Sequence, residues 1–446
     1  MAWDIKDPAR LLADELTLRA ESGYDLSIAE PRVSAALEQG DLSSIARAEL
    51  TLEHTVRRHD WPYVEPSDLA EIERSRTPAP APPSSLDDDA LGDRLLAAWL
   101  GRCAGCNLGK PVEGWSRARI RGYLDHAGAY PIDDYIPVVD DMSGELRLND
   151  CWPETTRGNV AFMARDDDID YTILALHLLE DRGFDIGPGD VAAEWLDHLP
   201  YTQIYTAERL AYRNLVIGLM PPRTASFRNP YREWIGAQIR ADLYGYVFPG
   251  DPSSASSMAF QDASLSHTEN GIYGAMWVAA LIATAITTPD VSEALRTSIT
   301  WIPPRSRLVE ALHDVLEMHA SGMDWELARD GIEARYGHYS SVHTINNAAV
   351  VASALLWGDG DYTTTVGLAV QAGWDTDCNG ATAGSVFGAA HGTQALPGRW
   401  IDPLNDLIKS SIIGFDRSTP SDLAERTLRL ARSSSRNGVR AAGMRS

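Results

Sequence analysis

Cysteine and positive charge are both scarce in this chain, and each shortage excludes a class of protein. Four cysteines in 446 residues cannot form the disulfide framework of a small secreted domain. Lysine and arginine number 39 against 63 aspartates and glutamates, a formal net charge of −24. Such a chain repels a phosphate backbone or an anionic membrane surface, so neither nucleic acid nor a membrane is an expected partner.

Long apolar runs are scarce as well. Residues 271–288 form a long apolar stretch that is almost free of charge, and this length is about the shortest that can span a membrane. No basic flank follows the segment, and its glycine and alanine content predicts a helix packed on all sides within a large helical protein. The first seven residues carry charges where a secretory signal needs an apolar run, so we expect a cytoplasmic location.

The rest of the composition is that of an ordinary globular protein, with 44% hydrophobic and 23% charged residues. Apolar residues recur at helical spacing through most of the chain, whereas no convincing series of alternating strands and no regular repeat is present. The sequence therefore predicts an all-α fold.

The stretch TPAPAPPSS at residues 77–85 is typical of an extended linker. It predicts four regions: a helical accessory region at 1–76, a linker at 77–89, a catalytic-sized domain at 90–432 and a flexible tail at 433–446. Residues 122–159 are rich in proline, glycine, aspartate and tyrosine, which predicts a long loop or lid. No feature of the sequence predicts an oligomeric state.

Two dense aspartate clusters precede strongly apolar helical segments. Their members are Asp166, Asp167, Asp168 and Asp170 in the first cluster, and Asp375 and Asp377 in the second. An acidic run is usually a helix cap or a solvated face. Here both runs adjoin segments that should be buried, and buried like charges repel each other unless a cation is present. Carboxylate oxygens suit Mg²⁺, Mn²⁺ or Ca²⁺ better than zinc.

Cysteine and glycine spacings also carry structural information. Cys103 and Cys106 form a CxxC pair without a second pair nearby, which favours a buried structural role over a redox or zinc site. Gly380, Gly384 and Gly388 are spaced four apart, which predicts that their helix packs closely against its neighbours.

Four segments together resemble the ADP-ribosylglycohydrolase family, the relatives of dinitrogenase-reductase-activating glycohydrolase. In chain order they are GRCAGCNLGKPVEGW (101–115), DDDIDYTILALHLLE (166–180), SHTENGIYGAMWVAALIATA (266–285) and GWDTDCNGATAGSVFGA (373–389). The resemblance covers about residues 90–415. It implies an orthogonal helical bundle with two adjacent divalent metal ions, Mg²⁺ or alternatively Mn²⁺, and residues 1–76 add an N-terminal helical extension.

The metal ligands follow from the resemblance position by position. The family's first acidic motif is commonly Thr-Asp-Asp, and here Asp166 stands at the Thr position. The later motif is Asp-Thr-Asp-Thr, and here Cys378 replaces the last Thr, which leaves metal preference open. The implied ligands are Asp166, Asp167, Asp168, Asp375, Asp377 and Cys378.

Glu113 matches an acidic residue that lies beside the metals in relatives. The resemblance implies Glu113, Asp168 and Asp375 as catalytic groups, and either Glu113 or a metal-linked aspartate as the base. A carboxylate that orients water suits cleavage through an oxocarbenium-like centre, and paired metals can bind the ribose hydroxyls and lower the pKa of water.

Substrate contacts are implied in the same way. Glycine-rich backbone would wrap ribose or phosphate, and the segment after Leu265 would line the ligand wall. The implied substrate-binding residues are Gly105, Gly109, Gly114, His267, Asn270, Gly271, Tyr273, Asn379 and Gly380. His177, on the helix after the first acidic cluster, is interpreted as structural.

The resulting hypothesis is a metal-dependent hydrolase of an N- or O-glycosidic bond. It would remove ADP-ribose from a modified protein, nucleic acid or small molecule, with duplex nucleic acid as the least expected carrier. The alternatives are hydrolysis of another N-ribosyl nucleotide or nucleoside, and a non-catalytic ADP-ribose-binding protein, because a fold does not guarantee its reaction. Retention of Glu113 and of both aspartate pairs favours an enzyme.

Overall fold

The computed structural model describes residues 7–79 and 86–443. Helices dominate this part of the chain, and its strands are confined to the short antiparallel pair β1 (Ile408–Lys409) and β2 (Arg417–Ser418). The predicted all-α fold is thereby confirmed. Residues 80–85 of the linker predicted at 77–89 lie outside the described residues, and α5 already begins at Asp88.

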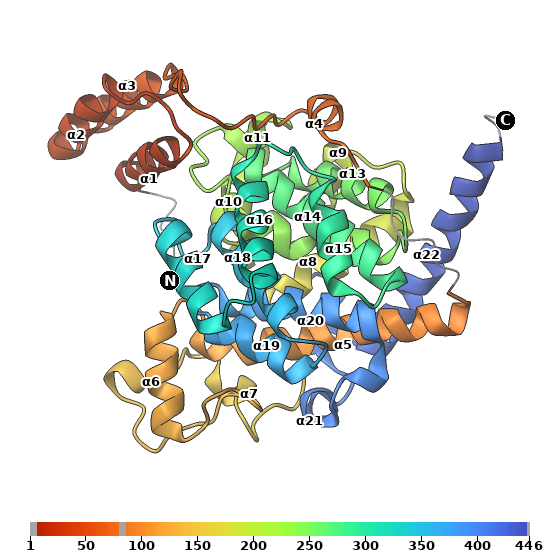
Figure 1. The fold of residues 1–446 in the computed structure, drawn as a ribbon. Coiled ribbons are helices and arrows are strands. Elements are labelled where there is room, and N and C mark those ends of the chain that lie inside the picture. Colours follow the sequence, from red (N-terminus) through yellow and green to blue (C-terminus); the bar gives the residue numbers. More distant parts are fainter. Residues whose placement is uncertain (1–6, 80–85, 444–446) are drawn as a thin grey trace.

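The accessory region forms a helical extension, as predicted, with the helices α1 (Pro8–Glu21), α2 (Ala29–Gln39), α3 (Leu42–Glu53) and α4 (Leu69–Ser75). Asp7, Asp41 and Asp68 accept backbone N–H groups in the first turns of α1, α3 and α4, because a short carboxylate satisfies donors that the helix leaves free. Helices α1–α3 share a small apolar core that includes Leu12 and Val33. They lie together at one corner of the molecule (Figure 1).

The main body begins at α5. Its helical elements up to residue 263 are α5 (Asp88–Gly109), η1 (Lys110–Val112), α6 (Arg117–Ala127), η2 (Gly144–Leu146), α7 (Trp152–Thr155), α8 (Asp167–Arg182), α9 (Pro188–His198), η3 (Tyr201–Gln203), α10 (Thr206–Val216), α11 (Arg223–Ser226), η4 (Ile235–Arg240), α12 (Asp242–Tyr246) and α13 (Pro252–Ala263). The later ones are α14 (Glu269–Thr287), α15 (Val291–Ile299), α16 (Arg307–Ala320), α17 (Trp325–Tyr336), α18 (Thr344–Trp357), α19 (Tyr362–Gln371), α20 (Thr376–His391), η5 (Thr393–Ala395), α21 (Gly398–Ile401), η6 (Asp402–Leu404) and α22 (Pro420–Gly443).

Two segments are more regular than the sequence suggested. The loop predicted at 122–159 contains the end of α6, the short turn η2 and α7. The tail predicted from residue 433 is mostly helical, because α22 runs to Gly443 and extends away from the main body (Figure 1). The first half of α22 packs against the core, where Leu423 and Ala431 are buried. No proline interrupts the rest of the helix.

Helix α14 lies at the centre of the main body. It is long and apolar enough to cross a membrane, yet 94% of its apolar window is buried inside the fold. It packs against α13, α12, η4 and α20. This confirms the prediction of a core helix enclosed on all sides.

Helices α5 and α20 pack backbone to backbone in the lower half of the view in Figure 1, above α7 and α21. A Cβ atom on Gly105 would overlap the carbonyl oxygen of Gly380, and one on Gly380 would overlap the carbonyl of Gly105. Gly101 and Gly384 face each other in the same way one turn along. The close packing predicted from the four-residue spacing is thus confirmed, and it places the C-terminal end of α5 beside the first turn of α20.

A buried ionic network joins the extension to the main body. Arg307, in the first turn of α16, donates to Glu65 of the extension (3.0 Å) and to Glu233 of the main body (2.7 Å). Glu65 also accepts a hydrogen bond from Asn270 at 2.8 Å. Because a buried charge is tolerated only when it is paired, these contacts make the extension an integral part of the fold.

Candidate active site

The two acidic clusters meet where α5 ends. Gly109, the last residue of α5, packs against the backbone of Thr376, whose hydroxyl donates to the Gly109 carbonyl at 2.8 Å. Helix α5 also holds the start of α8, because the guanidinium group of Arg102 donates a hydrogen bond to the Asp168 carbonyl at 2.8 Å. The first turns of α8 and α20, which carry the aspartates, are therefore both held by α5.

A strained turn brings Glu113 to the second cluster. Gly373 and Trp374 both adopt positive φ angles, 79° and 68°, and this conformation is unfavourable for a tryptophan. The Gly114 N–H donates to the Trp374 carbonyl (2.9 Å), and the Trp374 N–H donates to the Trp115 carbonyl (3.0 Å). Arg329 lies 4.0 Å above the Trp374 ring. These contacts hold Glu113 beside the start of α20.

The carboxylates form overlapping groups whose ligand atoms lie within 4.8 Å of one another. One group is Asp168, Asp377 and Cys378, and a second is Glu113, Asp375 and Asp377. Asp377 thus belongs to both. Oδ2 of Asp168 and Oδ1 of Asp377 are buried and make no hydrogen bond with the described residues. Buried polar atoms normally have a partner, so these orphaned oxygens fit the ligand set of a cation.

The other aspartates of the first cluster have different surroundings. Asp166 caps α8, because its Oδ1 accepts from the Asp168 N–H at 2.9 Å. Asp167 lies in the first turn but is in none of the close groups described above. Asp170 faces away, toward Arg165 at 2.9 Å and Ser411.

Sequence reasoning missed Lys110, which contributes a buried positive charge to the site. Its ammonium group forms an ion pair with Asp166. Burial alone would raise the pKa of Asp166, but this ion pair outweighs it and lowers the pKa to about 2. The only signal in the sequence is the position of Lys110 directly after Gly109, within the segment 101–115.

The pKa values of most of the remaining carboxyl groups are raised. Desolvation, reinforced by the charges of Asp375 and Asp166, raises the pKa of Glu113 to about 8. Burial and the charge of Asp166 raise the pKa of Asp167 to about 7. Burial followed by neighbouring carboxylates raises the pKa values of Asp168, Asp375 and Asp377 well above the ordinary value. The cluster therefore retains protons at neutral pH unless a cation compensates its charge.

The donors fit divalent cations, since carboxylate oxygens dominate and two of them are orphaned. Sulfur is also present. Cys106 forms a third close group with Asp166 and Asp168, although the CxxC pattern had suggested only a structural role. Burial raises the pKa values of the Cys106 and Cys378 thiols well above the usual range, so both remain protonated without a metal.

The structure gives the glycines of the first motif a packing role. Gly105, Gly109 and Gly380 press against backbone atoms, so a side chain larger than hydrogen would not fit at these positions. Gly114 differs, because it has a φ of 76° and a Cβ placed there would meet no atom within 4 Å. Asn379 lies in the site: its amide donates to Asn347 at 2.8 Å, and its buried carbonyl oxygen makes no hydrogen bond with the described residues.

The predicted ligand wall at the start of α14 is not brought to the carboxylates. Asn270 donates to Glu65 and Glu233, and Tyr273 donates to the carbonyl of Pro66. His267 is fully buried with Nδ1 2.8 Å from the Ser266 hydroxyl, and Gly271 packs against the Arg232 carbonyl and the His267 ring. Residues 65–67 of the extension therefore contact this end of α14.

A cavity of about 570 Å³ opens beside the turn that holds Glu113. Its size is in the range of small-molecule sites. Its lining includes Gly114, Trp115, Arg117, Arg121, Tyr130 and Trp374.

His343 supports the site from α18. It caps that helix through Nδ1, which accepts from the Ile345 N–H at 3.2 Å. One turn later, Asn347 accepts from the Asp375 N–H at 3.3 Å. Burial lowers the pKa of His343 to about 3 and outweighs the opposing charge of Glu233. The imidazole is therefore neutral in the fold at pH 5.

We expect His343 to make stability fall as the pH drops from 6.5 toward 3, because the unfolded chain gains a proton in this window and the folded chain does not. At pH 5 this effect amounts to about 2 kcal/mol. His343→Asn retains a capping acceptor, so the difference in unfolding free energy between pH 7.5 and 5 should shrink by about that amount. His126→Asn, on an exposed face of α6, should leave the pH dependence unchanged. An unchanged difference in His343→Asn would contradict the prediction.

The fold and the gathered carboxylates define an all-α protein with a candidate divalent-metal centre. The family model described as ADP-ribosylglycohydrolase matches residues 87–437, so the chain belongs to the ADP-ribosylglycohydrolase family. Family membership identifies it as a glycohydrolase. A solved structure described as "ADP-ribosylglycohydrolase-related protein complex" is similar at 22% identity, covering 77% of this chain and 99% of that chain with a TM-score of 0.46. A search of curated proteins found no match.

Proposed function

We propose that the protein is a metal-dependent hydrolase that cleaves the ribosyl glycosidic bond of an ADP-ribosylated molecule and releases ADP-ribose. The observation that carries this proposal is the overlap of two ligating groups at Asp377, one with Asp168 and Cys378 and the other with Glu113 and Asp375. A carboxylate shared between two groups suits two adjacent divalent cations.

The oxygens of Asp166, Asp168, Asp375 and Asp377 would hold these cations, and Mg²⁺ is the best match for an oxygen-rich set. Bound there, the metals would supply contacts to the ribose hydroxyls and lower the pKa of water. Cys378 is a softer donor than the threonine usual in the family, and this favours Mn²⁺ more than a purely oxygen site would.

Glu113 would act on the water. Asp168 and Asp375 are only 1% and 3% exposed, whereas Glu113 lies at the rim of the cluster and is partly open to solvent. A carboxylate in that position can accept a proton from water and stabilise the positive charge that develops on ribose. The neighbouring cavity would take the nucleotide portion, because its volume of about 570 Å³ is in the range of small-molecule sites.

The proposal is tested by measuring ADP-ribose release from ADP-ribosyl-arginine, ADP-ribosyl-serine and ADP-ribosylated DNA, each in Mg²⁺, Mn²⁺ and EDTA. We expect release from at least one conjugate with either metal and none in EDTA. Loss of a residue that hydrogen-bonds to a metal ligand typically costs ~10–100-fold in metal affinity. Because Asp377 would itself be a ligand, Asp377→Asn should weaken metal binding by at least that factor. Asp89→Asn, on the exposed first turn of α5, serves as the matched control.

Two other outcomes would replace the proposal. Release of a free base from nucleosides, without action on any conjugate, would indicate a nucleoside hydrolase. Binding of ADP-ribose that raises the thermal stability, without turnover of any conjugate, would indicate a non-catalytic binding protein.

A further inference from the structure

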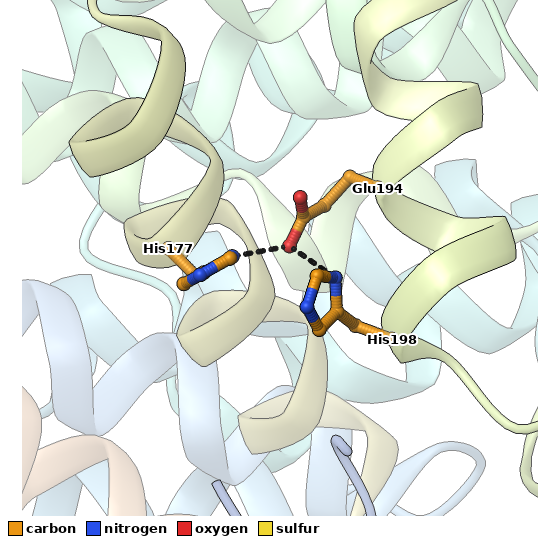
Figure 2. A group of neighbouring side chains, drawn as sticks. All are labelled: His177, Glu194 and His198. Atoms are coloured by element: carbon orange, nitrogen blue, oxygen red, sulfur yellow. Dashed lines mark hydrogen bonds and ion pairs between the residues drawn. The ribbon is translucent and has the colours of Figure 1, made fainter. Parts of the chain in front are cut away.

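His177, Glu194 and His198 form a cluster apart from the acidic site (Figure 2). His177 is on α8, ten residues beyond Asp167, which corresponds to about 15 Å along the helix at 1.5 Å per residue. Glu194 and His198 are one turn apart on α9, so they share a face of that helix. The two helices pack against each other and direct all three side chains toward one point (Figure 2).

Both imidazoles face the same carboxylate oxygen. Nδ1 of His177 lies 2.7 Å from Oε1 of Glu194, and Nδ1 of His198 lies 3.3 Å from that oxygen. Glu194 is only 7% exposed. Nδ1 of His198 is buried and makes no hydrogen bond of acceptable geometry with the described residues. A buried ring nitrogen aimed at a carboxylate without a hydrogen bond indicates that a ligand belongs between them.

The spacing suits a tetrahedral metal ion. Zinc binds histidine nitrogen and carboxylate oxygen at about 2.0–2.2 Å, so adjacent ligand atoms in a tetrahedron are about 3.3 Å apart. The two measured separations from Oε1 are 2.7 and 3.3 Å, and all three ligand atoms lie within 4.8 Å of one another. The side chains of His177 and His198 are 26% and 28% exposed, which leaves access for an ion and for a water in a fourth position.

Surrounding contacts fix the two histidines. The Phe415 ring packs on His177 with centroids 4.9 Å apart. The Ile413 N–H donates to the His198 carbonyl at 2.9 Å. The segment after β1 thus supports both ligands, and such support holds metal-binding side chains in one orientation.

We propose that His177, Glu194 and His198 bind a Zn²⁺ ion that links α8 to α9 and keeps one coordination position open to water. Two imidazoles and one carboxylate suit zinc, whereas the carboxylate-rich acidic site suits Mg²⁺ or Mn²⁺. The ion would stabilise α8, whose first turn carries Asp167 and Asp168. His177 then has a binding role in place of the structural one inferred from the sequence, and this site is independent of the proposed hydrolase activity.

Calorimetric titration of metal-free protein with Zn²⁺, in buffer with saturating Mg²⁺, tests the proposal. The wild type should bind zinc and unfold at a higher temperature with zinc than without it. His177→Gln and His198→Gln should each lower the zinc affinity by more than the ~10–100-fold that loss of an outer partner costs. His126→Gln, at an exposed position of α6, should behave as the wild type.

The variant Asp377→Asn shows whether zinc binds at the histidine cluster or at the acidic groups that contain cysteine. It should retain the zinc binding that His177→Gln loses. Unchanged zinc affinity in both histidine variants would overturn the proposal, as would its loss in Asp377→Asn alone. If the histidine variants fail to fold, X-ray absorption at the zinc edge of the wild type decides. Two imidazole ligands would support the proposal, and only oxygen and sulfur ligands would refute it.

Discussion

Replacing Glu113 by glutamine should lower kcat for ADP-ribose release by about 10²–10⁴-fold, the usual contribution of a general base. Glutamine preserves the size of the side chain but cannot accept a proton from water. Since Asp375 and Asp377 remain, binding of the metals should persist, and Mg²⁺ should still raise the thermal unfolding temperature of the variant. The measurement is kcat at saturating substrate together with thermal unfolding in Mg²⁺ and in EDTA.

A matched control is Glu38→Gln, because Glu38 is exposed on α2 of the extension. It should leave kcat unchanged. Full activity in Glu113→Gln, combined with a large loss in Asp375→Asn, would transfer the role of base to Asp375. Full activity in both variants would refute the assignment of the site to this cluster.

The acidic clusters could be found in the sequence because their signal is local. Asp166 and Asp168 stand directly before an apolar run with helical spacing, and the structure starts α8 there. Asp375 and Asp377 likewise flank the start of α20. That the clusters meet could not be derived from composition, since it depends on how α5, α8 and α20 cross. The glycine spacing of α20 indicated a close crossing but not its partner.

The residues at the start of α14 show what local patterns leave out. Asn270 and Tyr273 follow a histidine in a motif that suggested ligand binding, yet their partners are Glu65 and Pro66. These contacts join segments about 200 residues apart across a seam that the linker composition marked as a boundary. No short-range pattern specifies such a contact, because it depends on how the extension docks. Lys110 was missed for the same reason, since its partner Asp166 is distant in the sequence.

The crossing of α5 and α20 leads to a prediction about stability in which two effects oppose each other. Alanine is favoured over glycine in a helix interior by about 1 kcal/mol. At Gly105 the added Cβ would overlap the carbonyl of Gly380, and forcing backbones apart in a packed core costs about 3 kcal/mol. Gly105→Ala should therefore be destabilised. Gly122→Ala in α6, where no atom lies within 4 Å of the added Cβ, should instead gain about 0.5–1 kcal/mol.

Chemical denaturation of both variants in EDTA measures the change in the free energy of unfolding without a contribution from bound metal. The change should be a loss for Gly105→Ala and a gain for Gly122→Ala. A second readout tests the link to the site. Because the contact between Gly105 and Gly380 sets how closely α5 and α20 approach each other, Gly105→Ala should also weaken Mg²⁺ binding, whereas Gly122→Ala should not. Equal stabilisation of the two variants would mean that the helices separate easily, and the backbone contact would then not be what holds Asp375 and Asp377 against the end of α5.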